Sequence, residues 1–257
     1  MKIRFPEPKT ALITGAAKRI GRSIAFELSD AGWSVAIHHR SSEMEAEDTV
    51  SSILSKGGNA VAIAAELSNE EETLGLIAQT KSLLGPIGCL VNNASIFEYD
   101  SIDSVSLQSW NDHMAINLRA PFLLSQSMSA SLPEGYHGVI INILDQRVWN
   151  LTPHFISYTL SKSGLWTLTQ TLALALAPNI RVNAIGPGPV LPSIRQTESQ
   201  FFDQCKNTPL QQGAKPEEIA LAVRFIVMAS SMTGQMIALD GGQHLGWSLP
   251  KGSEFEE

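Results

Sequence analysis

Three side chains suited to holding or moving a proton lie near one another in the sequence: Asp145, Tyr158 and Lys162. In a helix, residues four positions apart share a face, so we expect Lys162 one turn beyond Tyr158. A phenol with a pKa near ~10 is a weak acid at neutral pH, and a nearby ammonium group lowers that pKa by favouring the phenolate. Tyr158 is therefore a candidate general acid tuned by Lys162. The same spacing also arises by chance on solvated helix faces, so other features must support the interpretation.

A candidate phosphate-binding loop lies near the N-terminus. The segment from Thr14 to Gly21 follows a short apolar run and opens a helical pattern. Glycines such as Gly15 and Gly21 allow a tight turn and let backbone N–H groups approach a pyrophosphate at a helix N-terminus. Arg19 occupies a position where a third glycine is common, and its guanidinium is suited to pair with phosphates and to reach the active site. A plain strand-to-helix turn is the alternative.

The end of the second expected strand, His38-His39-Arg40-Ser41, bears on the choice of cofactor. A site specific for NAD would place Asp or Glu here to bind the ribose 2′-OH, whereas a cation and a hydroxyl suit a 2′-phosphate. NADP is therefore the expected cofactor, with His39, Arg40 and Ser41 beside its 2′-phosphate. An ordinary surface role for Arg40 is the alternative.

Short β-rich runs alternate with longer amphipathic patterns along the chain. The pattern Ile20–Ala31, with apolar residues at Ile20, Ile24 and Leu28, is typical of a helix. Repeated strand-helix-strand units predict an α/β, doubly wound (Rossmann) parallel sheet of about seven strands with helices on both faces, binding ligands at the carboxyl ends of the strands. Strands are expected at Lys9–Thr14, Ser34–His38, Ala60–Ala64, Cys89–Asn92, Val139–Ile143, Arg181–Ala184 and Met236–Leu239.

Composition restricts the possible functions. The 257 residues, 44% of them hydrophobic, suit one domain over 1–257, with a polar, proline-containing substrate lid at about 188–215. A net charge of −7 argues against a nucleic-acid or anionic-membrane surface. The chain lacks membrane-length apolar runs, a signal-peptide pattern and metal-binding spacings, and its two cysteines, Cys89 and Cys205, are far apart in sequence. We therefore expect a cytoplasmic protein without a structural metal.

Several motifs in one order resemble the short-chain dehydrogenase/reductase family, and the resemblance covers almost the whole chain. They are Thr14-Gly15…Gly21, Asn92-Asn93-Ala94, Asn117, Tyr158-x-x-x-Lys162 and Pro187-Gly188. The resemblance implies that Tyr158 donates a proton, that Lys162 holds the nicotinamide ribose, and that Asn117 supports a water relay. It also implies that the Asn-Asn-Ala segment closes the adenine and ribose side of the cofactor site. The expected cofactor site further includes Lys18, Ile20, Glu66, Leu67, Asn93, Ala94, Ser95, Pro187 and Gly188.

Departures from the common family pattern point to one branch. Ordinary members carry a serine where Asp145 stands; an ionised aspartate cannot donate a hydrogen bond, so it suits a substrate edge bearing N–H groups. Together with Arg19, His39-Arg40-Ser41 and the segment Asn93–Phe97, Asp145 resembles the pteridine reductase branch. The resemblance implies that Ser95, Phe97 and Arg19 contact a pterin, with the Phe97 ring stacking it against the nicotinamide. The alternatives are a loop cap for Asp145, a turn hydroxyl for Ser95 and a core or lid aromatic for Phe97.

The expected function is NADPH-dependent reduction of a pterin or dihydropterin, with Tyr158, hydrogen-bonded to Asp145, as proton donor. A ketone or 3-oxoacyl reductase with the same Tyr/Lys pair is the alternative, and Asp145 argues against it. A non-catalytic NADP-binding sensor is a second alternative, since a fold does not guarantee activity, and the intact Asn117, Tyr158 and Lys162 argue against it. The partner is expected to be a small-molecule substrate. The resemblance also implies a homotetramer formed through long helices around 115–132 and 155–177.

Overall fold

The computed structural model describes residues 6–193 and 195–246 and contains one seven-stranded sheet in the order β3-β2-β1-β4-β5-β6-β7. All neighbouring strands pair in parallel. The order reverses between β1 and β4, which is the place where doubly wound sheets bind ligands. The strands are β1 (Thr10–Ile13), β2 (Ser34–His39), β3 (Asn59–Ala64), β4 (Cys89–Asn92), β5 (Gly138–Ile143), β6 (Ile180–Pro187) and β7 (Met236–Leu239).

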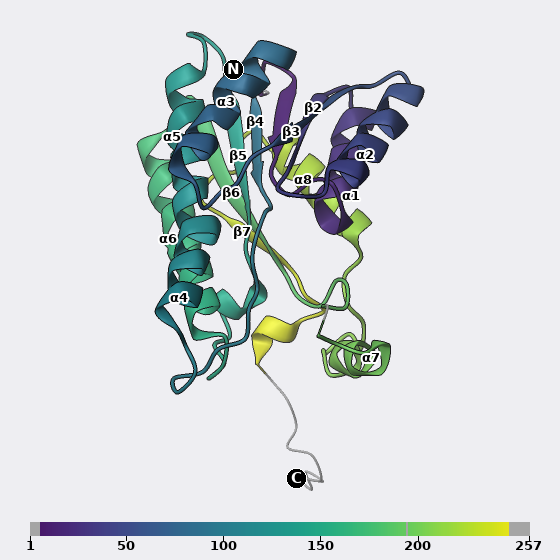
Figure 1. The fold of residues 1–257 in the computed structure, drawn as a ribbon, viewed down its shortest axis with the longest axis vertical. Coiled ribbons are helices and arrows are strands. Elements are labelled where there is room, and N and C mark those ends of the chain that lie inside the picture. Colours follow the sequence, from purple (N-terminus) through teal and green to yellow (C-terminus); the bar gives the residue numbers. More distant parts are fainter. Residues whose placement is uncertain (1–5, 194, 247–257) are drawn as a thin grey trace, which may run out of the picture.

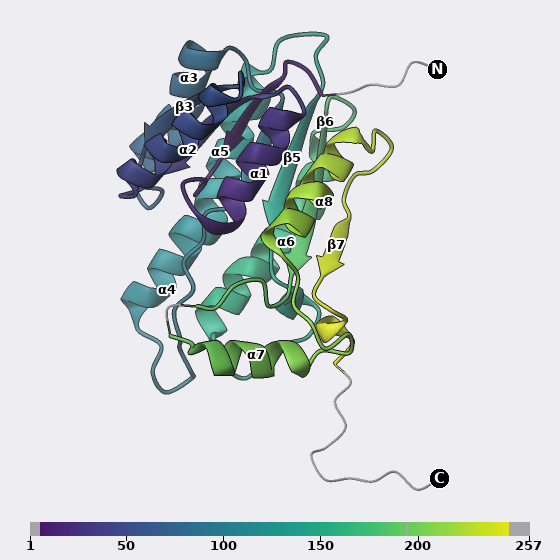
Figure 2. The same cartoon turned by 90° about the vertical axis from the view of Figure 1, so that its right-hand side faces the viewer.

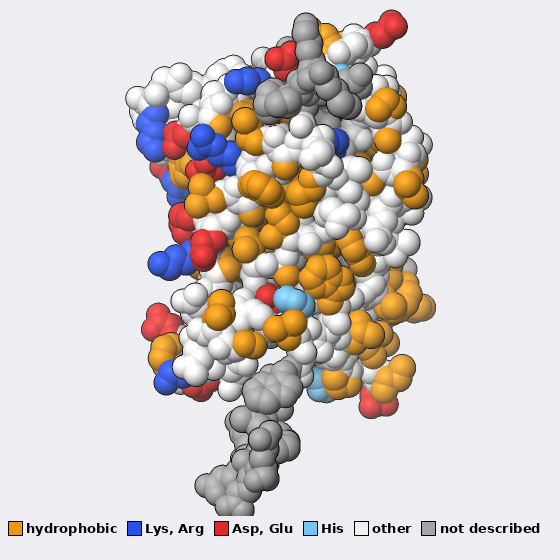
Figure 3. Space-filling view, turned by 180° about the vertical axis from the view of Figure 1, so that it is seen from behind, with side chains coloured by type: hydrophobic (Ala, Val, Ile, Leu, Met, Phe, Trp, Pro, Cys, Tyr) orange, Lys and Arg blue, Asp and Glu red, His pale blue; other side chains and the backbone are white. Residues whose placement is uncertain are grey.

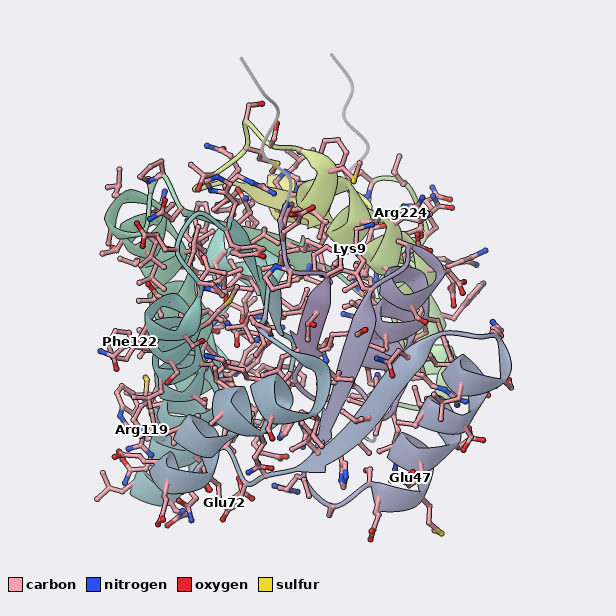
Figure 4. All side chains as sticks on the ribbon, turned by 90° about the horizontal axis from the view of Figure 1, so that it is seen from above. Lys9, Glu47, Glu72, Arg119, Phe122 and Arg224 are labelled. Carbon is pink, nitrogen blue, oxygen red and sulfur yellow. The ribbon has the colours of Figure 1, made fainter. Side chains whose placement is uncertain are left out.

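Helices cover both faces of the sheet (Figures 1 and 2). On one face, α1 and α8 pack together beside α2, and on the other α3 packs on α5 and α4 on α6. In the view from above, Phe122 and Arg119 point outward on one side while Arg224 lies on the other (Figure 4). The helices are α1 (Arg19–Asp30), α2 (Glu43–Ser55), α3 (Glu70–Leu84), α4 (Leu107–Met114), α5 (Ala120–Ser131), α6 (Ile156–Ala175), α7 (Glu198–Lys206) and α8 (Pro216–Met228).

The central strands are buried on both faces, as continuous apolar runs in a parallel sheet require. One core cluster joins Ile13 and Val91 to helix residues such as Ile24 and Val223 on the α1–α8 face. A second joins the opposite face of the same strands to α3, α5 and α6. The predicted doubly wound sheet is confirmed, and each of the seven expected strands is present. Strand β6 is longer than expected, because it continues to Pro187 and so ends at the site.

Two local features differ from the sequence expectations. The helical run expected around 115–132 begins with a π-helical turn, Ala115–Arg119, between α4 and α5. Such turns often accompany functional sites, and this one contains Asn117. The polar segment expected as a lid contains α7, which starts with a capping box between Thr197 and Gln200. Residue 194 of that segment lies outside the described residues.

Among the described helices, none combines the length and the apolar character that a membrane crossing requires.

Candidate active site

The loop between β1 and α1 is shaped to receive phosphates. Gly15 has φ +63°, and a Cβ on Gly21 would lie 2.4 Å from the Gly15 carbonyl oxygen, so both positions require glycine. No described side chain caps the N-terminus of α1 at Lys18, which leaves its first N–H groups available to an anion. Arg19 also has a positive φ of 55°, a costly conformation for a residue with a side chain.

Arg19 reaches across the carboxyl edge of the sheet. Its two terminal nitrogens donate to the carbonyl oxygens of Pro192 at 3.0 Å and Leu191 at 3.3 Å, both in the segment after β6. The same side chain lines two adjoining hollows along this edge. It therefore lies where the sequence predicted, between the phosphate loop and the substrate side.

His38 fixes the phosphate loop from the neighbouring strand. Its Nδ1 accepts a hydrogen bond from the Gly15 N–H at 3.0 Å, and its Nε2 lies 3.1 Å from the Ala65 carbonyl oxygen, to which it donates. Burial lowers the pKa of His38 to about 4, so the ring is neutral and this hydrogen-bonding pattern is retained at neutral pH. Sequence analysis placed His39 in the cofactor site, beside the 2′-phosphate; because successive strand residues face opposite sides, His38 lines that site and His39 does not.

The first hollow, of about 370 Å³, extends from the phosphate loop to the ends of β2 and β3. It contains most of the residues predicted for the cofactor: Gly15, Lys18, Arg19, Ile20, Gly21, Arg40, Glu66, Leu67, Asn93, Ala94 and Ser95. Arg40 is largely exposed beside Glu66, with 3.9 Å between Nε and the carboxylate. His39 is buried behind the strand and Ser41 is exposed outside the lining. His38, Ala65, Ile96 and Ile116 line the hollow without having been predicted.

Asp145, Tyr158 and Lys162 come together at the second hollow, of about 290 Å³. The phenol of Tyr158 donates to Asp145 Oδ2 at 3.0 Å, which confirms the predicted pairing. Asp145 Oδ1 accepts from the Arg147 N–H at 2.8 Å, so the carboxylate also caps the turn that follows β5. Lys162 lies one helical turn beyond Tyr158, and its Nζ donates to the Ile143 carbonyl oxygen at 2.8 Å.

The pKa of Tyr158 differs from the sequence expectation. Burial, followed by the charge of Asp145, raises the pKa of the phenol well above its usual value, and the prediction that Lys162 lowers it is wrong for this arrangement. The Lys162 Nζ lies 5.8 Å from the Tyr158 ring centroid and is bonded to a backbone carbonyl. Burial lowers the pKa of Lys162 itself to about 8, so part of its population is neutral near that pH.

Asn117 lies behind the site and joins three segments. Its Oδ1 accepts from the Ile96 N–H at 2.9 Å and from the Ser95 hydroxyl at 3.1 Å. Its Nδ2 donates to the Ile96 carbonyl oxygen and to Ser161 Oγ, and that hydroxyl donates to the Tyr158 carbonyl oxygen at 2.7 Å. In this structure Asn117 positions the Ser95 segment against the start of α6. Its water-relay role remains a prediction.

Phe97 forms an aromatic wall with Phe155 and Tyr158. The rings of Phe97 and Phe155 are stacked with centroids 4.4 Å apart, and Tyr158 meets Phe97 edge to face at 4.7 Å. The Arg147 guanidinium lies over all three rings, at 4.9 to 5.6 Å from their centroids. Phe97 lines the second hollow. Its stacking on a substrate remains a prediction, because one face of its ring is stacked on Phe155 in this structure.

The lining of the second hollow also comes from the segment after β6. The predicted residues Arg19, Ser95, Phe97, Asp145, Tyr158, Lys162, Pro187 and Gly188 are all present. The segment predicted as a lid adds Ser193, Gln196 and Phe201, and the Arg195 guanidinium donates to the Phe97 carbonyl oxygen. Gln146, Arg147 and Gln243 line the hollow as well and were not predicted.

The comparisons with known proteins agree with this geometry. A family model described as "Enoyl-(Acyl carrier protein) reductase" matches residues 15–244. The chain belongs to the short-chain dehydrogenase/reductase family. A curated relative, the 3-oxoacyl-[acyl-carrier-protein] reductase FabG of Staphylococcus epidermidis, is 33% identical over 92% of this chain and 99% of its own length.

Solved structures of this family resemble the chain more strongly. FolM alternative dihydrofolate reductase 1 from Brucella suis, in complex with NADP, shares 48% identity with a TM-score of 0.91, over 94% of this chain and 97% of that one. The Brucella canis protein, also complexed with NADP, shares 45% identity with a TM-score of 0.93, over 98% and 100%. A blue fluorescent protein from a metagenomic library, in complex with NADPH, is 31% identical with a TM-score of 0.86 over 92% and 98%. Like its family, the chain is an NADP-dependent oxidoreductase, which argues against the sensor alternative.

Proposed function

We propose that this short-chain dehydrogenase/reductase uses NADPH to reduce a pterin or dihydropterin. The observation that carries the proposal is the pairing of Asp145 Oδ2 with the Tyr158 phenol at 3.0 Å inside a hollow walled by Phe97. A carboxylate accepts hydrogen bonds from an amino or ring N–H edge, and a phenyl ring stacks on a flat heterocycle. The FolM proteins, named as alternative dihydrofolate reductases, support the same substrate class.

The residues around the first hollow fit NADP. The two hollows share Arg19, Ile20, Asn93 and Ser95, so a dinucleotide can extend from one to the other. Gly15 and Gly21 leave room for a pyrophosphate at the N-terminus of α1, and Arg40 offers a cation at the end of β2 for a 2′-phosphate. The cofactor is NADP, the cofactor in both Brucella complexes.

In the proposed reaction, a ring carbon of a C=N bond would receive a hydride, which is the chemistry that NADPH supplies when bound. Tyr158 supplies the proton to the ring nitrogen, and Asp145 accepts hydrogen bonds from the N–H edge of the substrate. Lys162 would hold the nicotinamide ribose from its buried position. The raised pKa of Tyr158 keeps the phenol protonated at neutral pH, so a proton is available for the reduction, but it also makes the phenol a weaker acid.

The test replaces Asp145 by Ser, which is common in the family, and by Asn, which keeps the shape and removes the charge. We expect both variants to lose about 10- to 100-fold in kcat/KM for dihydropterins while retaining NADPH affinity, because the N–H edge loses a charged acceptor. Comparing dihydropterins, dihydrofolate and simple ketones as substrates measures this effect. Unchanged dihydropterin reduction in both variants would show that the carboxylate has no such role.

A 3-oxoacyl reductase is the second candidate function, favoured by the FabG relative. It uses the same Tyr158 and Lys162 but requires a hydrogen-bond donor toward the substrate carbonyl, and an ionised Asp145 offers none. This candidate predicts that the wild-type protein reduces 3-oxoacyl thioesters faster than any pterin. The substrate panel distinguishes the two.

A homotetramer in the cytoplasm completes the proposal. Hydrophobic side chains spread over one face of the molecule (Figure 3). Large exposed side chains on the long helices support association with further copies: Phe122, Leu160, Leu174, Leu221, Phe225 and Met228. Light scattering coupled to size exclusion measures the mass, and a monomer at micromolar concentration would refute the tetramer.

A further inference from the structure

Arg147 is a partly buried cation in the active site for which the proposed mechanism gives no role. Its side chain is 14% exposed and lines the second hollow. Its Nε and Nη1 are buried without a hydrogen-bond partner among the described residues. A desolvated guanidinium is costly, so it persists only where other charges or aromatic faces compensate for the lost water.

The first compensation is the carboxylate of Asp145. Arg147 Nε lies 3.6 Å from Asp145 Oδ1, while Oδ2 of the same carboxylate receives the Tyr158 phenol. The Arg147 backbone N–H also donates to Oδ1. The guanidinium and the phenol therefore lie on opposite oxygens of one carboxylate, which couples them electrostatically.

The second compensation is the aromatic wall. The guanidinium carbon lies 4.9 Å from the Phe155 centroid, 5.4 Å from Phe97 and 5.6 Å from Tyr158. An arginine that contacts the faces of three rings restricts all of them. Two of these rings are the proton donor and the predicted stacking partner of the substrate.

We propose that Arg147 is the positioning residue of the Asp145–Tyr158 pair, supplying the positive charge and the ring contacts that hold the phenol ready to donate. Lys162 was expected to have the electrostatic role, but it is bonded to the Ile143 carbonyl oxygen. The inference rests on the proposed function only for the identity of the substrate, because any reduction that uses Tyr158 as its acid requires the pair.

The charges that face Tyr158 give the expected direction. Asp145 raises the pKa of the phenol and Arg147 lowers it. The other titratable groups nearby are Lys162 on α6, His113 on α4 with its ring 6.0 Å from Tyr158, and Arg195 of the lid segment over Phe97. Arg19, which also carries a charge, lines the same hollow. Removing Arg147 therefore leaves a weaker acid, and proton transfer becomes slower relative to the other steps.

The experiment compares the wild type with Arg147→Met, which keeps much of the volume without the charge, and Arg147→Lys, which keeps the charge. We expect kcat of Arg147→Met to fall about tenfold or more, with a larger solvent deuterium isotope effect and with KM for NADPH changed by less than about threefold. Any basic limb of the kcat–pH profile is expected at higher pH in Arg147→Met. In Arg147→Lys, the isotope effect and the pH profile should return toward wild type.

Arg195→Met is the matched control, because Arg195 lies over the same Phe97 ring at 5.7 Å and is paired with Glu98 rather than Asp145. It is expected to change KM and to leave the isotope effect as in the wild type. If Arg147→Met does not fold, Arg147→Gln takes its place. A wild-type kcat and isotope effect in the neutral variant, or a Lys variant impaired as much as the neutral one, would overturn the inference.

The assays use both a dihydropterin and a simple ketone. If only the ketone is turned over, the proposed substrate class fails while the effect of Arg147 on Tyr158 is still measured. If the dihydropterin is turned over and Arg147→Met behaves as wild type, the proposed function stands and the inference about Arg147 fails.

Discussion

The two oxygens of the Asp145 carboxylate have different partners, the Tyr158 phenol and the loop after β5. Oδ2 receives the Tyr158 phenol, while Oδ1 accepts the Arg147 N–H and so caps the turn after β5. The structure shows the loop cap directly and leaves Oδ2 beside the phenol, where the proposed role as acceptor requires it. The hydrogen bond from the Arg147 N–H to Oδ1 fixes the orientation of the whole carboxylate. It therefore also fixes the position of Oδ2 beside the Tyr158 phenol.

Lys162 is buried at a cost to stability, and this leads to a prediction about pH. Its pKa is lowered to about 8 in the folded protein from the ordinary 10.5, so between these values the unfolded chain binds more protons. Stability due to this group therefore rises as pH increases from 8 toward 10.5, by about 3 kcal/mol in total. In Lys162→Met this rise is absent, and near pH 7 the variant is expected to be more stable than wild type by about 1–3 kcal/mol.

Denaturant unfolding of both cofactor-free proteins at about pH 7 and about pH 9.5 measures the effect. The comparison uses the difference between the proteins, because burial also raises the pKa of Cys89 to about 12, which lowers stability of both at alkaline pH. Activity should be lost in Lys162→Met. A variant less stable than wild type at every pH would contradict the prediction.

For individual residues, the sequence predicted which residues form the site better than it predicted which way their side chains point. Asp145 and Tyr158 were paired correctly because the motif that predicts them also predicts the strand end and the helix that carry them. His38 was missed because the parity of a strand decides which of two adjacent histidines faces the loop, and the sequence of β2 is apolar on both faces. Arg147 was missed because its burial depends on Phe97 and Phe155, which come from other loops.

At the scale of elements, the start of α1 combines strain with function. Arg19 has φ 55°, where a glycine would be relaxed, and it lines both hollows. We predict that Arg19→Gly keeps the free energy of unfolding within about 1 kcal/mol of wild type, because relief of backbone strain offsets the lost side-chain contacts. Its NADPH affinity should nevertheless fall about tenfold or more, because the cofactor phosphates no longer have the Arg19 guanidinium as an ion-pair partner.

Arg19→Ala is the control, because it removes the same side chain but cannot relax at a positive φ. It should bind NADPH as weakly as Arg19→Gly and be less stable by about 1 kcal/mol. Calorimetric titration and urea unfolding give the two quantities. Equal stability of the Gly and Ala variants would show that the backbone at this position is not strained.

Other elements show what sequence patterns can and cannot resolve. The strands were predicted because buried parallel strands are continuous apolar runs, and these are hard to mistake when they recur between helices. The π-helical turn around Asn117 was not predicted, because it lies between two short helices, α4 and α5, which offer too few turns to reveal the shift in apolar phase that one extra residue causes. Helix α7 was predictable in principle, since Thr197 and Gln200 form the spacing of a capping box.

At the scale of the whole molecule, the reversal of strand order explains why distant segments form one site. The loops after β1, β4, β5 and β6 all emerge at the carboxyl edge, where they bring Arg19, Asn93, Asp145 and Gly188 to the lining of one hollow. Binding along this edge joins the two halves of the sheet, so a bound dinucleotide should stabilise the entire fold. Comparing the melting temperature of the protein with NADPH and with NADH therefore shows which of the two cofactors it prefers.

NADPH is predicted to raise the melting temperature more than NADH does. At about 100 times its Kd, a ligand that binds only the folded state stabilises it by about 2.7 kcal/mol, or roughly 5–10 °C for a protein of this size. Arg40→Gln should lower the shift with NADPH and leave the shift with NADH unchanged, because only the 2′-phosphate needs the cation. Arg224→Gln is the matched control, since Arg224 pairs with Glu27 on the surface and lines neither hollow. Thermal unfolding of the three proteins at equal ligand concentrations gives six shifts, and a wild-type protein stabilised equally by both cofactors would contradict the role of Arg40.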